Sequence, residues 1–325
     1  MTNFSKYKVV KNNRNSSFEF FQSKRPPSKY PVTTPFTFPF IGKDVVLCLD
    51  KNNWWNPLGG HIETDENYKD TLLRESNEEA GVTISKSSIA TLGYILNTNL
   101  DDSSSAQYPP LNILPITRSF VTRIDQNWKP RETRARGIFR KKKALELMKE
   151  RTDNNQMFEI LELAYQIFED QKYQTNFTYY PNKMFKTIPI TQVFTFCKDS
   201  NGHYCVVKDT DEEFFSLPGG SCELGETPEE CISRELDEEA QLSCKDPKLL
   251  GSILVELKQG NEVVSRFQHL RYMADLDLLQ EFVPNKKGFE TSERQFLPLS
   301  ELKSKVMLLR NPNGEALINQ ISNSV

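Results

Sequence analysis

The chain has 325 residues, of which 37% are hydrophobic and 26% charged, and its formal net charge is −3. This length is enough for two globular domains of ordinary size, each with its own core. The slightly negative balance excludes a global basic field of the kind that attracts nucleic acid. No run approaches the roughly 18 apolar residues of a membrane-spanning helix. The composition therefore indicates soluble, folded domains.

Cysteine usage and the N-terminus bear on the compartment. Six cysteines are present and none forms a C-x-x-C pair, namely Cys48, Cys197, Cys205, Cys222, Cys231 and Cys244. Only three histidines accompany them, so we expect reduced, mostly buried thiols and no disulfide framework. The first ten residues lack an apolar signal core, and we therefore expect a cytoplasmic protein.

The elements outside the repeat described next are few. Residues 1–35 are polar and include the stretch KRPPSKYP, an N-terminal arm that the sequence leaves unassigned. The segment MFEILELAYQIFED places apolar residues on one helical face, at Phe158, Leu161, Tyr165 and Phe168. The polar stretch QTNFTYYPNK, which contains Pro181, is typical of a linker. These features predict one domain over residues 36–175 and a second over 176–325.

An internal repeat decides the organisation of the chain. The segment NPLGGHIETDENYKDTLLRESNEEAGV and the later segment SLPGGSCELGETPEECISRELDEEAQL share their key residues at a constant separation of 160 positions. The matching pairs are Gly60 and Gly220, Glu66 and Glu226, Arg74 and Arg234, and Glu79 and Glu239. Flanking matches, such as ETRARGIF and ETSERQFL, are separated by 158 positions. A period of this length indicates a duplicated domain.

Each copy predicts a strand, a glycine turn and an acidic helix. In the second copy Thr227 is a good N-cap and Pro228 suits the first helical position. An apolar stripe follows, Ile232, Leu236 and Ala240 in the second copy and Leu72, Ser76 and Ala80 in the first. The opposite side carries Glu235, Glu238 and Glu239, matched by Glu75, Glu78 and Glu79.

Three carboxylates at positions i, i+3 and i+4 repel one another by a few tenths of a kcal/mol per pair. They also lie toward a helix C-terminus, where the helix dipole disfavours negative charge. A hard divalent cation with oxygen ligands would remove this cost. Arg74 and Arg234 stand beside the glutamates and are suited to hold one of them in a fixed rotamer.

These residues resemble the Nudix box, G-x5-E-x7-R-E-U-x-E-E-x-G-U, where U is a bulky aliphatic residue. The first copy supplies Gly60, Glu66, Arg74, Glu75, Glu78, Glu79, Gly81 and Val82, and the second supplies Gly220, Glu226, Arg234, Glu235, Glu238, Glu239 and Leu242. The resemblance implies an α/β (α+β) fold class, with two α/β/α sandwich domains that contain mixed sheets, in tandem. It also implies hydrolysis, with Mg²⁺ or Mn²⁺, of a diphosphate in a nucleoside diphosphate linked to another group.

The resemblance assigns roles to individual residues. The metal ligands would be Glu75, Glu78, Glu79 and the Gly59 carbonyl in the first copy, and Glu235, Glu238, Glu239 and the Gly219 carbonyl in the second. Glu66, Arg74, Glu226 and Arg234 would support them. The general base is open between the glutamate after the box arginine, Glu75 or Glu235, and a glutamate on a later loop, for which Glu132 and Glu290 are better candidates than Glu293.

Two positions depart from the box. Ser76 stands where a bulky aliphatic residue belongs, and we expect weaker packing beneath the first helix. Gln241 replaces the glycine that ends the helix, and a left-handed conformation there would cost roughly 1 kcal/mol. Neither change removes a charged group.

A basic run from Lys129 to Lys143, KPRETRARGIFRKKK, keeps other functions open. Such a run can bind phosphates of RNA, but it is more often a solvated loop and helix start. The alternatives to a cytoplasmic pyrophosphohydrolase with two active copies are one catalytic and one binding copy, a sensor of a nucleotide metabolite, and an RNA 5′-end pyrophosphohydrolase. Nucleotide sanitation and cleavage of an ADP-ribose-type compound are the leading substrate hypotheses.

Overall fold

The computed structural model describes residues 7–11, 14–99, 109–150, 155–210, 212–222, 226–285 and 291–323. The chain divides into two compact units, of which the first comprises residues 1–174 and 257–266 and the second 175–256 and 267–325. Each unit contains one β-sheet with helices. Within the part of the chain just listed, no helix is both long and apolar enough to cross a membrane.

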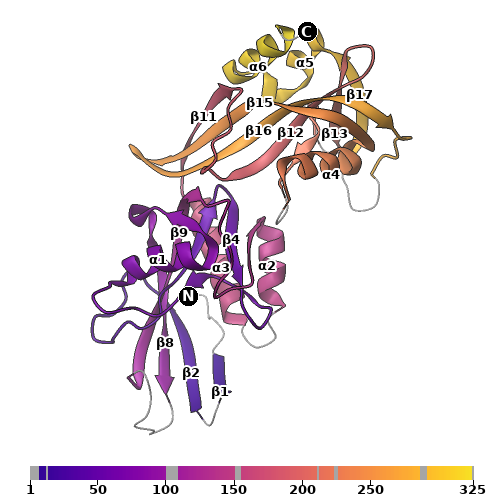
Figure 1. Ribbon diagram of the computed structural model, residues 1–325. Helices are drawn as coiled ribbons and strands as arrows, with labels where there is room; N and C mark the ends of the chain where they lie inside the picture. Colours follow the sequence, from indigo (N-terminus) through magenta and orange to yellow (C-terminus); the bar gives the residue numbers. More distant parts are fainter. Residues whose placement is uncertain are drawn as a thin grey trace. The chain divides into compact units, whose positions relative to one another are not determined.

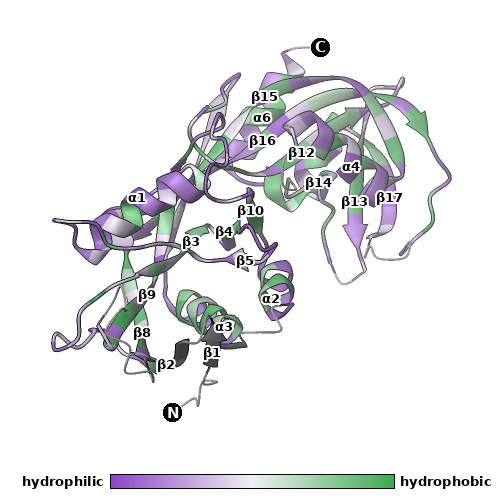
Figure 2. Cartoon of the chain, turned by 60° about the horizontal axis from the view of Figure 1, so that its bottom comes forward, coloured by the Kyte–Doolittle hydropathy of each residue, from purple (hydrophilic) through white to green (hydrophobic). Residues whose placement is uncertain are grey.

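The first sheet has the strand order β1-β2-β8-β9-β3-β4-β10. Its strands are β1 Tyr7–Lys11, β2 Arg14–Gln22, β3 Phe36–Ile41, β4 Asp44–Leu49, β5 Trp55–Asn56, β6 Leu58–Gly59, β7 Val82–Ile84, β8 Ala90–Asn99, β9 Leu111–Ile124 and β10 Ala135–Phe139. The helices are α1 Tyr68–Ala80, η1 Lys86–Ser88, α2 Lys141–Lys149 and α3 Asn155–Asp170. Strands β3 and β9 run parallel, whereas β8 and β9 are antiparallel, so the sheet is mixed. In Figure 2, α1 and α3 lie on opposite sides of strands β3, β4 and β9.

The second sheet repeats this plan with the order β11-β15-β16-β12-β13-β17. Its strands are β11 Gln174–Pro181, β12 Ile190–Lys198, β13 His203–Asp209, β14 Gly219–Gly220, β15 Leu242–Gln259, β16 Glu262–Leu279 and β17 Thr291–Pro298. The helices are α4 Pro228–Ala240, α5 Leu299–Lys305, η2 Met307–Leu309 and α6 Pro312–Ser322. Strands β12 and β16 run parallel, as β3 and β9 do. Helix α4 lies on one side of this sheet, and α5 and α6 lie on the other (Figure 1). The predicted α/β fold with two mixed sheets in tandem is confirmed.

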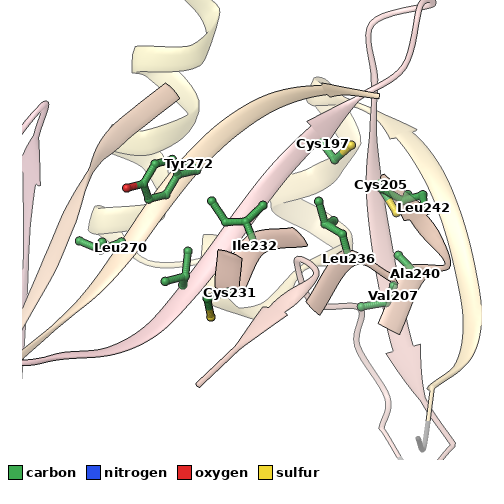
Figure 3. Close-up of a cluster of buried hydrophobic side chains, with 11 residues drawn as sticks. Cys197, Cys205, Val207, Cys231, Ile232, Leu236, Ala240, Leu242, Leu270 and Tyr272 are labelled. Carbon is green, nitrogen blue, oxygen red and sulfur yellow. The ribbon is translucent and has the colours of Figure 1, made fainter. Parts of the chain in front are cut away.

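The apolar stripe of α4 closes the core on its side of the second sheet. Ile232, Leu236 and Ala240 are buried in one apolar cluster with Val193 and Cys197 of β12. Figure 3 shows the three helix residues and Cys197. The spacing of four residues keeps one helical face on the sheet and leaves the opposite face to the glutamates.

The corresponding stripe of α1 contains Ser76, where the sequence predicts weaker packing beneath the helix. Leu72, Ser76 and Ala80 are all fully buried. The Ser76 hydroxyl has no hydrogen-bond partner among the described residues. The first helix therefore buries an unsatisfied polar atom where Leu236 provides an apolar contact in the second.

The amphipathic helix predicted between the two copies is confirmed as α3. Tyr165 and Phe168 are buried, and their rings lie 5.1 and 5.3 Å from the ring of Phe40 on β3. In Figure 2 the helix alternates between apolar and polar residues along its turns.

Two terminal segments of these units differ from the sequence analysis. The polar stretch expected to be a linker is strand β11, an edge strand of the second sheet, so that prediction is wrong. The unassigned N-terminal arm contributes β2 to the first sheet, where it pairs with β8. All six cysteines are free thiols and four of them are buried, as predicted.

Candidate active site

Helix α1 is fixed at both ends by local interactions. The Asn67 side chain accepts hydrogen bonds from the backbone amides of Lys69 and Asp70, which caps the N-terminus. Gly81 ends the helix with a φ of 59°, in the left-handed region that favours glycine. A Cβ at Gly81 would also lie 2.4 Å from the Trp128 side chain, so no larger residue fits there.

Helix α4 is capped by different residues. Thr227 and Glu230 form a capping box, and Pro228 occupies the first turn, as predicted. Gln241 ends the helix with a φ of 49°, in the left-handed region, so the cost considered for a non-glycine residue at this position applies. Its side chain offsets the cost: Nε2 donates to the Val283 carbonyl and Oε1 accepts from the Val283 amide, both at 2.9 Å.

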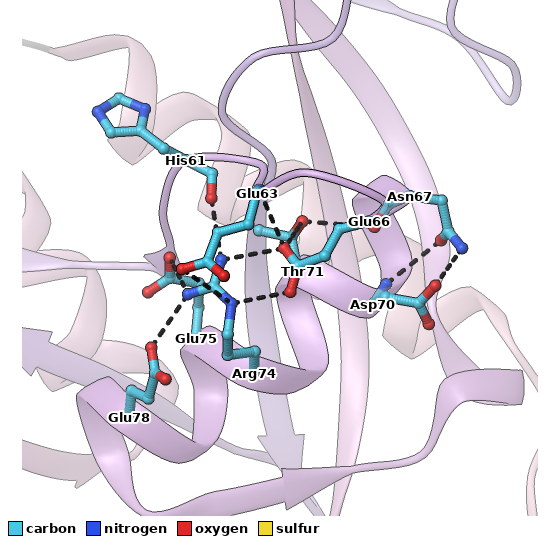
Figure 4. A network of polar contacts seen from close by, with 9 residues as sticks. All are labelled: His61, Glu63, Glu66, Asn67, Asp70, Thr71, Arg74, Glu75 and Glu78. Atoms are coloured by element: carbon cyan, nitrogen blue, oxygen red, sulfur yellow. Dashed lines mark hydrogen bonds and ion pairs between the residues drawn. The ribbon is translucent and has the colours of Figure 1, made fainter.

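Arg74 is the centre of the polar network on α1 (Figure 4). Its Nε donates to Glu66 Oε1 at 2.9 Å, and its Nη1 donates to Glu75 Oε1 at 2.9 Å and to Glu78 Oε2 at 3.0 Å. Its Nη2 donates to the carbonyl of His61 at 2.9 Å. One guanidinium thus holds three carboxylates and the loop that enters the helix.

Arg234 makes the same set of contacts on α4. It donates to Glu226 Oε1 at 2.8 Å, to Glu235 Oε1 at 2.9 Å and to Glu238 Oε2 at 2.9 Å. Its Nη2 donates to the Ser221 carbonyl at 2.9 Å. The two arginines therefore donate to equivalent glutamates and to equivalent carbonyls of the entering loop.

The glycine turn is tied to the last glutamate of each cluster. The Gly59 amide donates to Glu79 Oε2 at 2.8 Å, and the Gly219 amide donates to Glu239 Oε2 at 2.9 Å. The φ angles of these glycines are 155° and 148°, and an added Cβ would lie within 2.2 Å of the neighbouring strand's backbone. Glycine is required at both positions because the turn approaches the sheet so closely.

The second glycine of each turn brings the backbone against a glutamate. A Cβ on Gly60 would lie 2.0 Å from Glu75 Oε1, and one on Gly220 would lie 2.4 Å from Glu235 Oε1. Glycine therefore lets the turn and the first glutamate of the cluster occupy adjacent space in both copies.

Burial opposes ionisation of the first cluster. Desolvation, with a smaller contribution from the carboxylates of Glu75 and Glu132, raises the pKa of Glu79 to about 8, although the hydrogen bond from the Gly59 amide lowers it. Burial also raises the pKa of Glu75. Glu66 is the exception, since hydrogen bonds from Arg74 lower its pKa to about 2. Burial therefore disfavours the charged forms of Glu75 and Glu79, whereas Arg74 stabilises the charged form of Glu66.

The later loop reaches the site in the first copy. Glu132 is exposed and lies close enough to act on the pKa of Glu75 and of Glu79, and the adjacent Thr133 hydroxyl donates to the Glu79 carbonyl at 2.8 Å. In the second copy Glu290 falls outside the described residues. Glu293 lies on β17 in an ion pair with Lys208, with 2.9 Å between Nζ and Oε2.

Sequence reasoning missed two arginines that stabilise the helix ends. Arg136 Nη1 donates to the Ala80 carbonyl at 2.7 Å, and Arg294 Nη1 donates to the Ala240 carbonyl at 2.6 Å. Positive charge at these carbonyls offsets the unfavourable position of the glutamates near a helix C-terminus. The match of ETRARG with ETSERQ aligns Arg136 with Arg294, and this alignment is the sequence signal for the two arginines.

Three residues of the basic run from Lys129 to Lys143 make contacts within the first unit. The Arg136 guanidinium also lies 5.2 Å from the Trp128 ring, and Lys141 forms an ion pair with Glu169 at 2.7 Å. Arg134 donates to the side chain of Asn53. These three basic side chains are engaged within the first unit.

The residues of both clusters suit a hard divalent cation. The donors are carboxylate oxygens in close array, and a bound cation would stabilise the charged form of Glu79, which burial disfavours. The ligands would be Glu75, Glu78 and Glu79 on α1 and Glu235, Glu238 and Glu239 on α4. The Gly59 and Gly219 carbonyls remain predicted ligands. An ion held in this way would supply binding of phosphate oxygens and would lower the pKa of a bound water.

Each unit contains a mixed sheet, and in each a glycine turn leads from the sheet to a helix that carries the carboxylates. The chain is therefore a tandem α/β protein with one acidic site per unit. The chain belongs to the Nudix family, since the family model described as the NUDIX domain matches it twice, over residues 39–141 and 190–318. Members of this family use divalent metal ions.

Solved structures with similar folds cover about half of the chain. A point mutant of a pyrophosphohydrolase from Bacillus subtilis is 21% identical, and the match covers 47% of this chain and 98% of that one with a TM-score of 0.38. The NUDIX domain of Shewanella oneidensis NrtR, solved with ADP ribose, is 16% identical over 45% and 93% of the two chains, with a TM-score of 0.32. A UDP-X diphosphatase is 19% identical over 55% and 76%, with a TM-score of 0.32. The comparison with curated proteins found no match.

Proposed function

We propose that the chain is a divalent-metal-dependent pyrophosphohydrolase with two active sites. Its substrate class would be a nucleoside diphosphate linked to another group, hydrolysed with Mg²⁺ or Mn²⁺. Damaged nucleoside triphosphates and ADP-ribose-type compounds are the two substrate types that we would test first.

The observation that carries this proposal is the agreement of the two carboxylate networks. Arg74 and Arg234 bond to equivalent glutamates, and the amides of Gly59 and Gly219 bond to Glu79 and Glu239. A solvated acidic helix face would have no reason to reproduce these bonds in both copies. The agreement also favours two active copies over one catalytic and one binding copy.

The protein's own residues would position the reactants. Arg74 keeps Glu75 and Glu78 in fixed rotamers, so the carboxylates are organised before any ligand arrives. Glu132 and Glu75 remain the candidates for holding the proton released by the attacking water in the first copy. In the second copy the corresponding candidates are Glu235 and Glu290.

The test is turnover of a nucleotide panel, with Mg²⁺ and with Mn²⁺, by the full chain and its variants. Glu79→Gln and Glu239→Gln each remove one charge from one cluster, and the double variant removes both. Asp70→Asn and Asp237→Asn are matched controls, since each lies on the same helix but outside the cluster. We expect each glutamate variant to lose roughly 10- to 100-fold or more of one copy's activity, and the controls to keep theirs.

The outcomes separate the alternatives. Loss of different substrates in the two single variants would show that the copies act on different compounds. Complete loss in one single variant and none in the other would overturn the proposal of two active copies. Nucleotide binding without any turnover by the wild type would overturn the hydrolase and favour a sensor. RNA 5′-end hydrolysis would appear as salt-sensitive turnover of a triphosphorylated RNA in the same panel.

A further inference from the structure

A second set of metal-binding atoms lies beside the second acidic helix. The Sγ atoms of Cys222 and Cys231 and a carboxylate oxygen of Glu226 all lie within 4.8 Å of one another. The spacing of these cysteines in the sequence contains no C-x-x-C pair, and the fold alone brings them together. Three donors at such mutual distances match the ligands of one tetrahedral ion.

Each member of this trio is held by a different part of the fold. Cys231 lies in the first turns of α4 and is fully buried in the core (Figure 3). Cys222 lies two residues after Gly220 and is half-buried, so an ion can reach it from solvent. Glu226 precedes the helix and is fixed by two hydrogen bonds from Arg234, at 2.8 and 3.0 Å.

The first copy has no counterpart of this trio. Ile62 and Thr71 occupy the positions of the two cysteines, 160 residues earlier. The Thr71 hydroxyl donates directly to Glu66 Oε2 at 2.8 Å, so a hydrogen bond takes the place of the thiol. The sulfur ligands are therefore an addition to the box and form no part of the arrangement that both copies share.

The geometry points to a binding site for a thiophilic divalent cation of the Zn²⁺ class at Cys222, Glu226 and Cys231, with water as the fourth ligand. Two thiolates and one carboxylate are ligands that Zn²⁺ accepts, whereas Mg²⁺ takes oxygen ligands. Its two sulfur donors make this site chemically distinct from the carboxylate cluster of Glu235, Glu238 and Glu239, which lies next to it on α4. It does not depend on the proposed hydrolase activity, because metal binding can be measured without turnover.

Arg234 connects the trio to the acidic cluster. Its Nη2 lies 3.7 Å from Cys231 Sγ and 3.0 Å from Glu226 Oε2, while its Nη1 holds Glu235 and Glu238. A cation that shares Glu226 would repel this guanidinium and weaken its hold on both glutamates. Glu235 and Glu238 would therefore be held less firmly when Zn²⁺ is bound at the trio.

The test compares metal binding by the full chain and by a variant with the first copy's residues. Cys222→Ile with Cys231→Thr reproduces the pattern of Ile62 and Thr71, which the fold already accommodates. Cys244→Ser is the control, since that cysteine is also half-buried but lies outside the trio. Bound Zn²⁺ is counted after equilibrium dialysis with a large excess of Mg²⁺, which fills the oxygen sites. Co²⁺ is then substituted, because sulfur ligation gives a charge-transfer absorption that oxygen ligation lacks.

We expect the wild type and Cys244→Ser to bind one more Zn²⁺ per chain than the double variant, and to show the sulfur–Co²⁺ band. The double variant should lose both signals and keep its far-ultraviolet circular dichroism. Equal Zn²⁺ binding by the wild type and the double variant would overturn the proposal. A wild-type Co²⁺ spectrum without sulfur ligation would overturn it as well.

Discussion

Ser76 illustrates how one side chain can weaken a helix without touching the chemistry. Its buried hydroxyl has no hydrogen-bond partner among the described residues, and such an atom costs about 1–3 kcal/mol. We expect Ser76→Ala to raise the free energy of unfolding of the first unit by about 1 kcal/mol. Thermal denaturation should show an increase of about 2–4 °C in its midpoint. An unchanged or lower midpoint would mean that the hydroxyl is satisfied in solution. Ser28→Ala, at an exposed serine of the same unit, is the control.

Asp44 gives the first unit a pH-dependent stability. Burial raises the pKa of this carboxyl from 3.8 to about 6, although the Arg140 charge lowers it. Since the folded pKa exceeds the unfolded one, the folded state binds the proton more tightly. Asp44 therefore stabilises the fold below about pH 4 relative to neutral pH, and this advantage is lost as the pH rises to about 6.

The corresponding prediction is that Asp44→Asn stabilises the unit at neutral pH and has little effect at low pH. We expect a gain on the order of 1–3 kcal/mol at pH 7, because each unit of pKa shift corresponds to about 1.4 kcal/mol. Thermal midpoints should be measured from pH 4 to pH 7.5. As the pH rises over this range, the midpoint of the wild type should drop increasingly below that of the variant. Parallel curves for the two proteins would contradict the prediction.

At the scale of elements, the end of α4 shows a strained residue held by its side chain. Two hydrogen bonds between the Gln241 side chain and Val283 offset the cost of the left-handed backbone at Gln241. Gln241→Gly would relieve about 1 kcal/mol of strain but lose two bonds worth about 1 kcal/mol each. Gln241→Ala would lose the bonds and keep the strain. We expect the free energy of unfolding, measured by urea denaturation, to decrease in the order wild type, glycine variant, alanine variant. A glycine variant with a higher free energy of unfolding than the wild type would refute this account.

The acidic helices were predictable because their signals are local. The spacing of the glutamates, the caps Thr227 and Gly81, and the buried stripe all follow from one helical period. Strand β11 was missed because nearly all of it is exposed, so its residues lack the apolar alternation that identifies a strand. The arginines that cap the helix ends were missed because their contacts join segments more than 50 residues apart, a relation that no local pattern contains.

At the scale of the whole molecule, the duplication predicts two separable responses to metal. A ligand that binds only the folded state adds about 2.7 kcal/mol at 100 times its dissociation constant. We expect Mg²⁺ to raise the calorimetric denaturation temperature of the wild type, and Glu79→Gln and Glu239→Gln to remove different parts of this increase. The double variant should give the same trace with Mg²⁺ as with a chelator. A full Mg²⁺ response in the double variant would show that the carboxylate clusters are not the metal sites.

The Trp128 ring at the end of α1 has a practical consequence. The three tryptophans of the chain, Trp54, Trp55 and Trp128, all belong to the first unit, and Phe282 lies beside Arg294 where Trp128 lies beside Arg136. Trp128 Nε1 also donates to the carbonyl of Glu78, within the first carboxylate cluster. Intrinsic tryptophan fluorescence of the unlabelled, full-length chain should thus report ligand binding at one site while the other stays optically silent.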